Sequence, residues 1–174
     1  MPYLSSALIF AGFQSAASRG LTKNALIDSE VVLISADQLV SHTKGDSGSV
    51  YWLGPVTGDV YSDNDNQAGV DLVSYWPKGS NPTTATLPTM TIATYDNSAV
   101  YATYVHPLSD AKTTKTVVVS GRTVRFSTDS MNHEIVTFSG KPEIVEINYP
   151  TWQTAQTLTK NAENLHLVSN ATIL

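Results

Sequence analysis

The sequence predicts an all-β fold, a single-domain antiparallel β-sandwich over residues 1–174 with one or two short helices. Two observations support this prediction. Val, Ile, Tyr, Thr and Trp recur in short runs that alternate with polar residues, and turn residues separate these runs at intervals of roughly ten residues. With eight or more strands, a jelly roll is a natural form of such a sandwich. No change in composition along the chain marks a second domain.

Residues 1–20 are expected to form an N-terminal arm or a helix ended by Gly20. Leu4–Ala17 is uncharged and partly apolar, but no Lys or Arg precedes the apolar run as in a signal peptide. The run is also too short and too interrupted by polar residues to span a bilayer. We therefore expect this segment to belong to the fold or to an assembly interface.

Alternating apolar residues predict a series of strands after residue 27. The predicted strands are Ile27–Ile34, Ser49–Leu53, Val70–Trp76, Thr89–Tyr95, Ala99–Val105, Thr116–Phe126 as a hairpin, His133–Phe138 and Glu143–Asn148. Asp96-Asn97 and Ser120-Gly121 fit two-residue hairpin turns, because these residue types tolerate positive φ. Pro77–Pro88 reads as a loop, since proline cannot donate to a central ladder.

One helix is predicted over residues 152–165, where Ala155, Leu158, Ala162 and Leu165 follow each other at spacings of three and four. Thr151 is a suitable N-cap for it.

Composition excludes several classes of function. The formal net charge is −5 and the ten Lys and Arg residues form no basic run, so direct nucleic-acid binding is not expected. The chain has 0 Cys, which excludes disulfides, thiolate metal sites and Cys nucleophiles. No transmembrane segment is expected, and only 14% of the residues are charged. This composition is typical of β-proteins that contact other proteins or glycans, and we do not expect an enzyme.

A calcium site is the one cofactor that the residues suggest. Hard oxygen ligands at alternate positions suit calcium, and an Asn-rich stretch expected to be a loop carries four aspartates: Asp59, Asp63, Asp65 and Asp71. The stretch is not an EF-hand, because the sixth position counted from Asp63 is Ala68 and the twelfth is Ser74. The alternative interpretation is a solvated acidic turn. The four His residues show no ligand spacing.

Aromatic residues suggest interaction surfaces. Tyr51-Trp52 and Tyr75-Trp76 are adjacent pairs, so one member of each pair is expected to face outward from its strand. Trp52 and Trp76, together with Phe10 and Phe13 of the N-terminal segment, are the candidate interface residues. The same aromatic residues could stack on sugar rings in a glycan-binding domain, although core packing is the more ordinary role.

Gly45-Asp46-Ser47-Gly48 is the sharpest catalytic motif. It resembles the segment around the nucleophile of trypsin-like serine proteases, but only 46 residues precede Ser47, too few for that family's preceding barrel with its His and Asp. With Glu163–His166 it also resembles two sequence blocks of SGNH esterases, which would make Ser47 the nucleophile and His166 the base. That family requires a parallel sheet, whereas this chain predicts hairpins. The alternative is a turn leading into the next strand.

In size, strand number, low charge and richness in Ser, Thr, Asn and Ala, the whole chain resembles single jelly-roll capsid proteins of tailless icosahedral viruses and small phage decoration proteins. The resemblance implies a structural, self-assembling virion protein whose partners are copies of itself and other virion proteins. The alternative is a secreted or cell-surface β-sandwich that binds glycans or acts in adhesion, with calcium as its cofactor. A Ser-dependent esterase is a remote third hypothesis.

Overall fold

The computed structural model describes residues 31–44, 48–66, 69–82, 87–104 and 112–170. Its helices are α2 (Ala36–Thr43), α3 (Ser98–Tyr104), α4 (Ala155–Asn164) and the 3-10 turn η1 (Val168–Asn170). Its strands are β1 (Tyr51–Trp52), β2 (Asp59–Asn66), β3 (Val70–Pro77), β4 (Met90–Tyr95), β5 (Thr114–Val119), β6 (Arg122–Ser127), β7 (His133–Phe138), β8 (Ile144–Asn148) and β9 (His166–Leu167).

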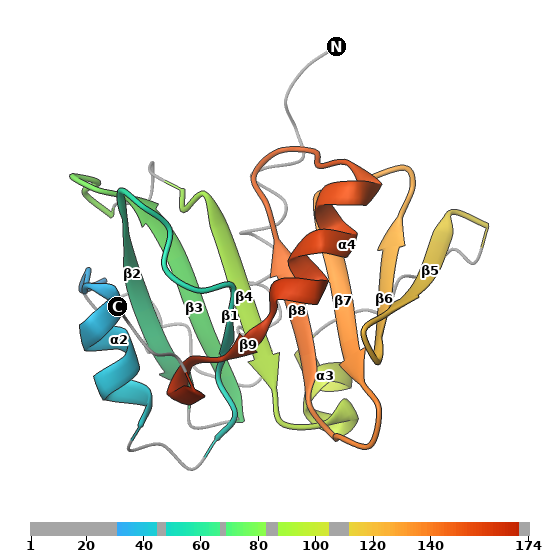
Figure 1. The fold of residues 1–174 in the computed structure, drawn as a ribbon, viewed down its shortest axis with the longest axis horizontal. Coiled ribbons are helices and arrows are strands. Elements are labelled where there is room, and N and C mark those ends of the chain that lie inside the picture. The colour runs from blue at the N-terminus through green and yellow to red at the C-terminus, as the bar shows by residue number, and fades with distance from the viewer. Residues whose placement is uncertain (1–30, 45–47, 67–68, 83–86, 105–111, 171–174) are drawn as a thin grey trace.

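Seven strands form one antiparallel sheet in the order β2-β3-β4-β8-β7-β6-β5. Two meanders build it, β2 to β4 and β5 to β8, and each joins neighbours by short connections. The meanders meet where β4 pairs with β8, for example Ile92 opposite Ile147. The sheet therefore has two edges, β2 on one side and β5 on the other (Figure 1).

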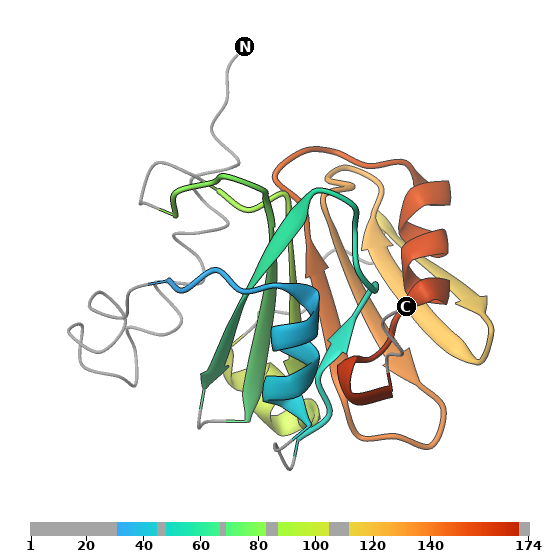
Figure 2. The same cartoon turned by 60° about the vertical axis from the view of Figure 1, so that its left-hand side comes forward.

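Further elements cover both faces of this sheet. The two-stranded sheet of β1 and β9 lies on one face together with α2 and α4, and α3 lies on the opposite face (Figures 1 and 2). The larger core cluster fills the first interface and includes Trp52, Ile92, Phe126 and Leu158, each 0% exposed. A smaller cluster around Tyr95 and the residues of α3 fills the second.

The structure confirms the all-β prediction, since the described residues form mainly antiparallel sheet with a few short helices. The jelly-roll form is not confirmed, because the strands divide into a seven-stranded and a two-stranded sheet. The predicted helix over residues 152–165 is present as α4, with Thr154 rather than Thr151 as its N-cap. The N-terminal arm, residues 1–20, lies outside the described residues.

Two local predictions are wrong, and one helix lies outside the predicted elements. Residues 98–104 form α3 rather than a strand, because the side-chain oxygen of Asn97 accepts hydrogen bonds from the N–H groups of Ala99 and Val100 and so starts a helix instead of a hairpin turn. Residues 36–43 form α2, which Ser35 and Gln38 start with reciprocal hydrogen bonds. The acidic stretch expected to be a loop is strand β2.

Candidate assembly interface

The two edges of the large sheet differ in how they are protected. At β2, the backbone of Ile34 exchanges two hydrogen bonds with Tyr61, at 2.7 and 2.9 Å. Helix α2 also packs against this strand, and β2 carries the charged residues Asp59 and Asp63. Bridging segments and charges are the usual devices that prevent an edge strand from pairing with another chain.

Among the described residues, the β5 edge has fewer of these devices. Six residues with the sequence TKTVVV form a regular strand whose single charge is Lys115. Within the described ranges, β5 pairs with β6 alone, and no other described strand pairs with its outer side at Thr116 and Val118. Val118 is 72% exposed, the highest exposure among the large hydrophobic residues of the described chain. An exposed, apolar edge of this kind is a template for strand pairing.

The register shows which backbone groups of β5 face outward. The N–H of Thr128 donates to the carbonyl of Thr113 at 2.8 Å, so position 113 faces the β6 side of the ladder. Polar groups alternate between the two sides of an antiparallel strand, so residues 115, 117 and 119 also face β6. The N–H and C=O groups of Thr116 and Val118 therefore point away from the sheet.

The local sequence explains why residues 114–119 form a strand. β-Branched residues dominate it and favour the extended backbone. Ser120 and Gly121 connect it to β6 with φ angles of 49° and 75°. Two successive positive φ angles are those of the hairpin turn that matches the natural twist of two paired strands. The hairpin predicted at Ser120-Gly121 is therefore confirmed.

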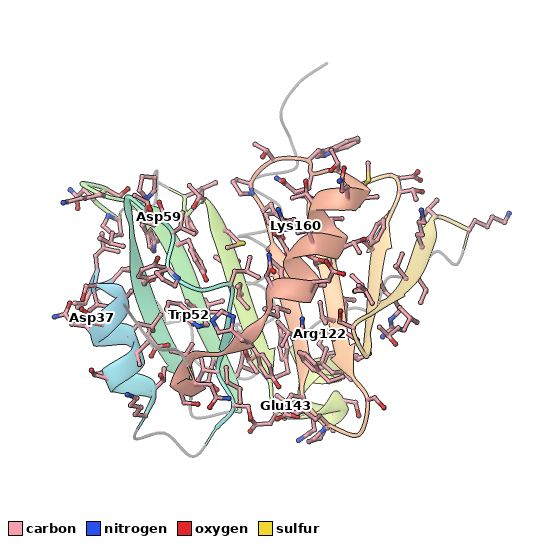
Figure 3. All side chains as sticks on the ribbon, in the orientation of Figure 1. Asp37, Trp52, Asp59, Arg122, Glu143 and Lys160 are labelled. Carbon is pink, nitrogen blue, oxygen red and sulfur yellow. The ribbon has the colours of Figure 1, made fainter. Side chains whose placement is uncertain are left out.

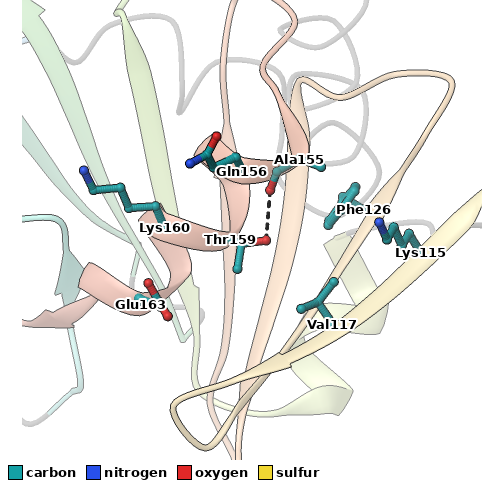
Figure 4. Close-up of a pocket in the computed structure, with 8 residues that line it drawn as sticks. All are labelled: Lys115, Val117, Phe126, Ala155, Gln156, Thr159, Lys160 and Glu163. Carbon is teal, nitrogen blue, oxygen red and sulfur yellow. Dashed lines mark hydrogen bonds between the residues drawn. The ribbon is translucent and has the colours of Figure 1, made fainter.

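A groove of about 520 Å³ runs beside this edge, between α4 and the β5–β6 hairpin (Figure 4). Apolar side chains of both layers line it together with charged and polar ones; the lining residues are Lys115, Val117, Phe126, Ala155, Gln156, Thr159, Lys160 and Glu163. The groove lies on the face of the sheet that α4 covers. A strand added to β5 would therefore lie next to a partly apolar hollow.

Helix α4 is fixed in place as one wall of this groove. Leu158 and Ala162 bury its inner face. The guanidinium of Arg122, at the start of β6, donates to the carbonyls of Ala162, Glu163 and Leu165 at the C-terminal end of the helix (Figure 3). A cation at this end satisfies carbonyl groups that have no partner within the helix and interacts favourably with the helix dipole.

A buried carboxyl group lies on the same face. Glu134 on β7 is 0% exposed, and one of its oxygens accepts a hydrogen bond from the hydroxyl of Tyr149 at 2.8 Å. That hydroxyl accepts a bond from the side-chain amide of Asn161 on α4 at 2.7 Å. Burial raises the pKa of Glu134 to about 8, against a smaller lowering effect of the Tyr149 hydrogen bond. The carboxyl group is therefore largely protonated at neutral pH, and the chain of bonds ties α4 to the sheet.

A second buried carboxylate lies on the opposite face. Glu146 on β8 contacts the imidazole of His133 at 2.7 Å and accepts a hydrogen bond from the hydroxyl of Tyr95 at 2.8 Å. Burial acts to raise the pKa of Glu146, but its bonds to His133, Tyr95 and Asn148 outweigh burial and lower it. The contact between Glu146 and His133 links the side chains of β8 and β7. The hydroxyl of Tyr101 on α3 is buried and has no partner among the described residues.

The four aspartates predicted as calcium ligands lie along the paired strands β2 and β3. Asp59 and Asp63 lie four residues apart on β2, about 13 Å at the usual strand rise. Asp65 is opposite Asp71 in the ladder, a further two residues along. Asp63 instead lies 3.8 Å from His42 of α2. Within the part of the chain that the structure describes, no three His, Asp or Glu side chains are placed to hold a metal ion.

The aromatic side chains predicted at the surface lie in the interior. Trp52 is 0% and Trp76 is 5% exposed, and the indole of Trp76 donates to the hydroxyl of Ser62 at 3.0 Å. Trp52 lies between the small and the large sheet, edge-on to Tyr61 (Figure 3). Neither indole offers a surface to a partner or a sugar ring. Phe10 and Phe13 lie outside the described residues.

The proposed esterase residues can be placed only in part. Ser47 lies outside the described residues. His166 is on β9, where one ring nitrogen is 2.8 Å from the carbonyl oxygen of Asn164 and the ring packs edge-on against Trp52. The antiparallel sheet also differs from the parallel sheet that the esterase resemblance requires.

Sequence reasoning identified the β5–β6 hairpin but not its position at the edge of the sheet. That position depends on strand order, which the alternation of residues does not encode. One signal was present in the sequence: three consecutive valines in a strand with one charge, in contrast to the acidic sequence of the opposite edge.

Comparison of the chain with protein-family models, curated proteins and solved structures finds no match. Among the described helices, none combines the length and the apolar character needed to cross a membrane.

Proposed function

We propose that this protein has a structural role and acts by assembling with copies of itself, as a component of a virion does. The observation that supports this proposal best is the β5 edge. There the backbone groups of Thr116 and Val118 point outward, and the side chain of Val118 is exposed. Pairing of an exposed strand with a strand of another chain is a recurrent mode of protein association. Main-chain hydrogen bonds provide affinity, and side chains on the two faces provide specificity.

The contrast between the edges supports this interpretation. The chain protects β2 with the Ile34 bridge, with α2 and with aspartates. If an open edge were only a hazard, stronger protection of β5 would be expected, because Lys115 is its single charge and a second lysine at position 118 would interrupt its run of valines. The valine that occupies this position instead favours contact with another apolar surface.

Charge and composition agree with a role in a shell. The net charge of −5 gives the protein no general attraction to nucleic acid, so assembly with protein copies rather than packaging of a genome is the role it fits. Few charged residues and many Ser and Thr residues leave a surface that costs less to desolvate than a highly charged one.

The test is the mass of the purified protein by light scattering across a concentration series, for wild type and for Val118→Lys. We expect wild type to form dimers or larger species as concentration rises and Val118→Lys to remain monomeric over the same range. Val32→Lys is the matched control, because Val32 is 65% exposed and remote from β5. A monomeric wild type at all concentrations, or assembly of Val118→Lys equal to that of wild type, would contradict the proposal.

A further inference from the structure

Resting on the proposed function, the geometry points to a specific partner for the β5 edge. We propose that β5 pairs with β5 of a second copy, antiparallel and around a two-fold axis between the two Val117 residues. The occupant is a second copy because the edge is complementary to itself in hydrogen bonding, in side-chain shape and in charge, as the register shows.

The hydrogen bonds determine the register. After Thr114, two residues of β5 have N–H and C=O groups that point outward: Thr116 and Val118. In an antiparallel pair, opposite residues of this kind exchange both of their bonds. If Thr116 lies opposite Val118 of the second copy, the symmetry places Val118 opposite Thr116 of the second copy. All eight outward groups are then satisfied in four hydrogen bonds.

The side chains agree with this register. Val117 lies opposite Val117 of the second copy as a non-hydrogen-bonded pair, the closer type, and two β-branched side chains pack well there. Lys115 lies opposite Val119 of the second copy, so no like charges are directly opposed. On the other face, the exposed Val118 is covered by Thr116 of the second copy.

The symmetry limits how far such assembly extends. The pairing joins two seven-stranded sheets into one continuous sheet and is closed, because each β5 has a single outer side. The outer strand at each end of the joined sheet is then β2, whose edge the Ile34 bridge protects. A two-fold axis perpendicular to the sheet also places both α4 helices and both grooves on the same face. The dimer is thus the unit from which any larger assembly forms through other surfaces.

Five opposed residue pairs form a small contact, less than the roughly 1,200 Å² that stable interfaces bury. We therefore expect a dimer that dissociates on dilution, which makes concentration the variable to control.

Cysteine cross-linking tests the register, because the chain has 0 Cys and each single-Cys variant has one reactive thiol. The Cα atoms of a non-hydrogen-bonded pair are about 4.5 Å apart, within the range for a disulfide. Two residues at position 118 would be about 8 Å apart, beyond that range, given the strand rise and spacing. We expect Val117→Cys to form disulfide-linked dimers under mild oxidation, at least tenfold faster than Val118→Cys or the remote Val32→Cys.

A mixing experiment gives a second readout that leaves Val117 intact. Thr116→Cys and Val118→Cys lie opposite each other in the proposed register, so we expect their mixture to form mixed dimers faster than either variant alone. If wild type dimerises but Val117→Cys does not cross-link faster than Val118→Cys, the two-fold register is wrong while the proposed function stands. If wild type is monomeric at every concentration, the proposed function fails as well.

Discussion

The pKa of Glu134 leads to a quantitative prediction about stability. The carboxyl group is 0% exposed, and one of its oxygens accepts a hydrogen bond from the hydroxyl of Tyr149. The other oxygen has no hydrogen-bond partner among the described residues. Burial raises its pKa from 4.5 to about 8. Folding therefore disfavours ionisation of this group, and the cost depends on pH.

The sign and size of this pH dependence follow from the linkage between proton binding and folding. Below about pH 4.5 the carboxyl group is protonated in both the folded and the unfolded chain, so it adds no pH-dependent term. As the pH rises towards 8, the unfolded chain loses the proton and the folded protein retains it, so the free energy of unfolding falls. The slope is about 1.4 kcal/mol per pH unit. The difference between pKa values of 4.5 and about 8 corresponds to about 5 kcal/mol in total.

Glu134→Gln removes this titration and keeps an oxygen that can accept the Tyr149 hydrogen bond. The extra amide hydrogens impose a cost of about 1–3 kcal/mol that does not vary with pH. We therefore expect the stability of the variant relative to wild type to rise by about 4 kcal/mol between pH 5 and pH 9. The measurement is urea unfolding followed by tryptophan fluorescence at several pH values.

Glu163→Gln is the control for a general effect of removing a carboxylate, because Glu163 is exposed on α4. We expect its stability relative to wild type to vary little with pH. If Glu134→Gln and wild type show parallel pH profiles, Glu134 is ionised in the folded protein, and the reasoning from burial is refuted.

Three further changes test other parts of the structure. Arg122→Met removes the donors to the C-terminal carbonyls of α4 and should lower the free energy of unfolding by about 1–3 kcal/mol, measured by urea unfolding. Gly69→Ala places a methyl group at φ 80° and 2.7 Å from the carboxylate of Asp96, and should cost about 1–2 kcal/mol in the same assay. The pKa of Glu146 is lowered, so its stabilising effect is lost as the pH falls below about 4.5. In Glu146→Gln, the free energy of unfolding should therefore fall less steeply with decreasing pH than in wild type, measured by the same urea unfolding.

The sequence predicted most strands of the large sheet, because alternation is strong where one or both faces are buried. His133–Phe138 is a strand with the predicted bounds. The prediction failed where local and tertiary preferences diverge. Residues 98–104 alternate like a strand, yet the cap at Asn97 and burial of Tyr101 favour a helix. Strand β2 is rich in Asp and Asn, and all of its residues pair with β3, so tertiary pairing overrides weak strand propensity.

The buried carboxyl groups could not be predicted from alternation. Glu146 occupies a polar position in an alternating run, which normally indicates a solvent-facing side chain. It is buried because α3 and neighbouring aromatic residues cover that face of the sheet. Glu134 was likewise not recognised, because its environment is formed by Tyr149 and α4, distant in sequence.

The unequal edges restrict the possible assemblies more strongly than composition does. A chain with two open edges would extend into a fibre, because each added copy would present a new edge. Among the described residues, the Ile34 bridge covers part of one edge, and no strand covers the other edge at Val118. In the proposed dimer, strand pairing stops at two copies, which gives a defined contact without the hazard of unlimited growth. A shell built from this protein therefore needs a second contact of a different kind, made by surfaces other than sheet edges. A variant such as Val118→Lys should then remove the dimer step and, with it, every larger species.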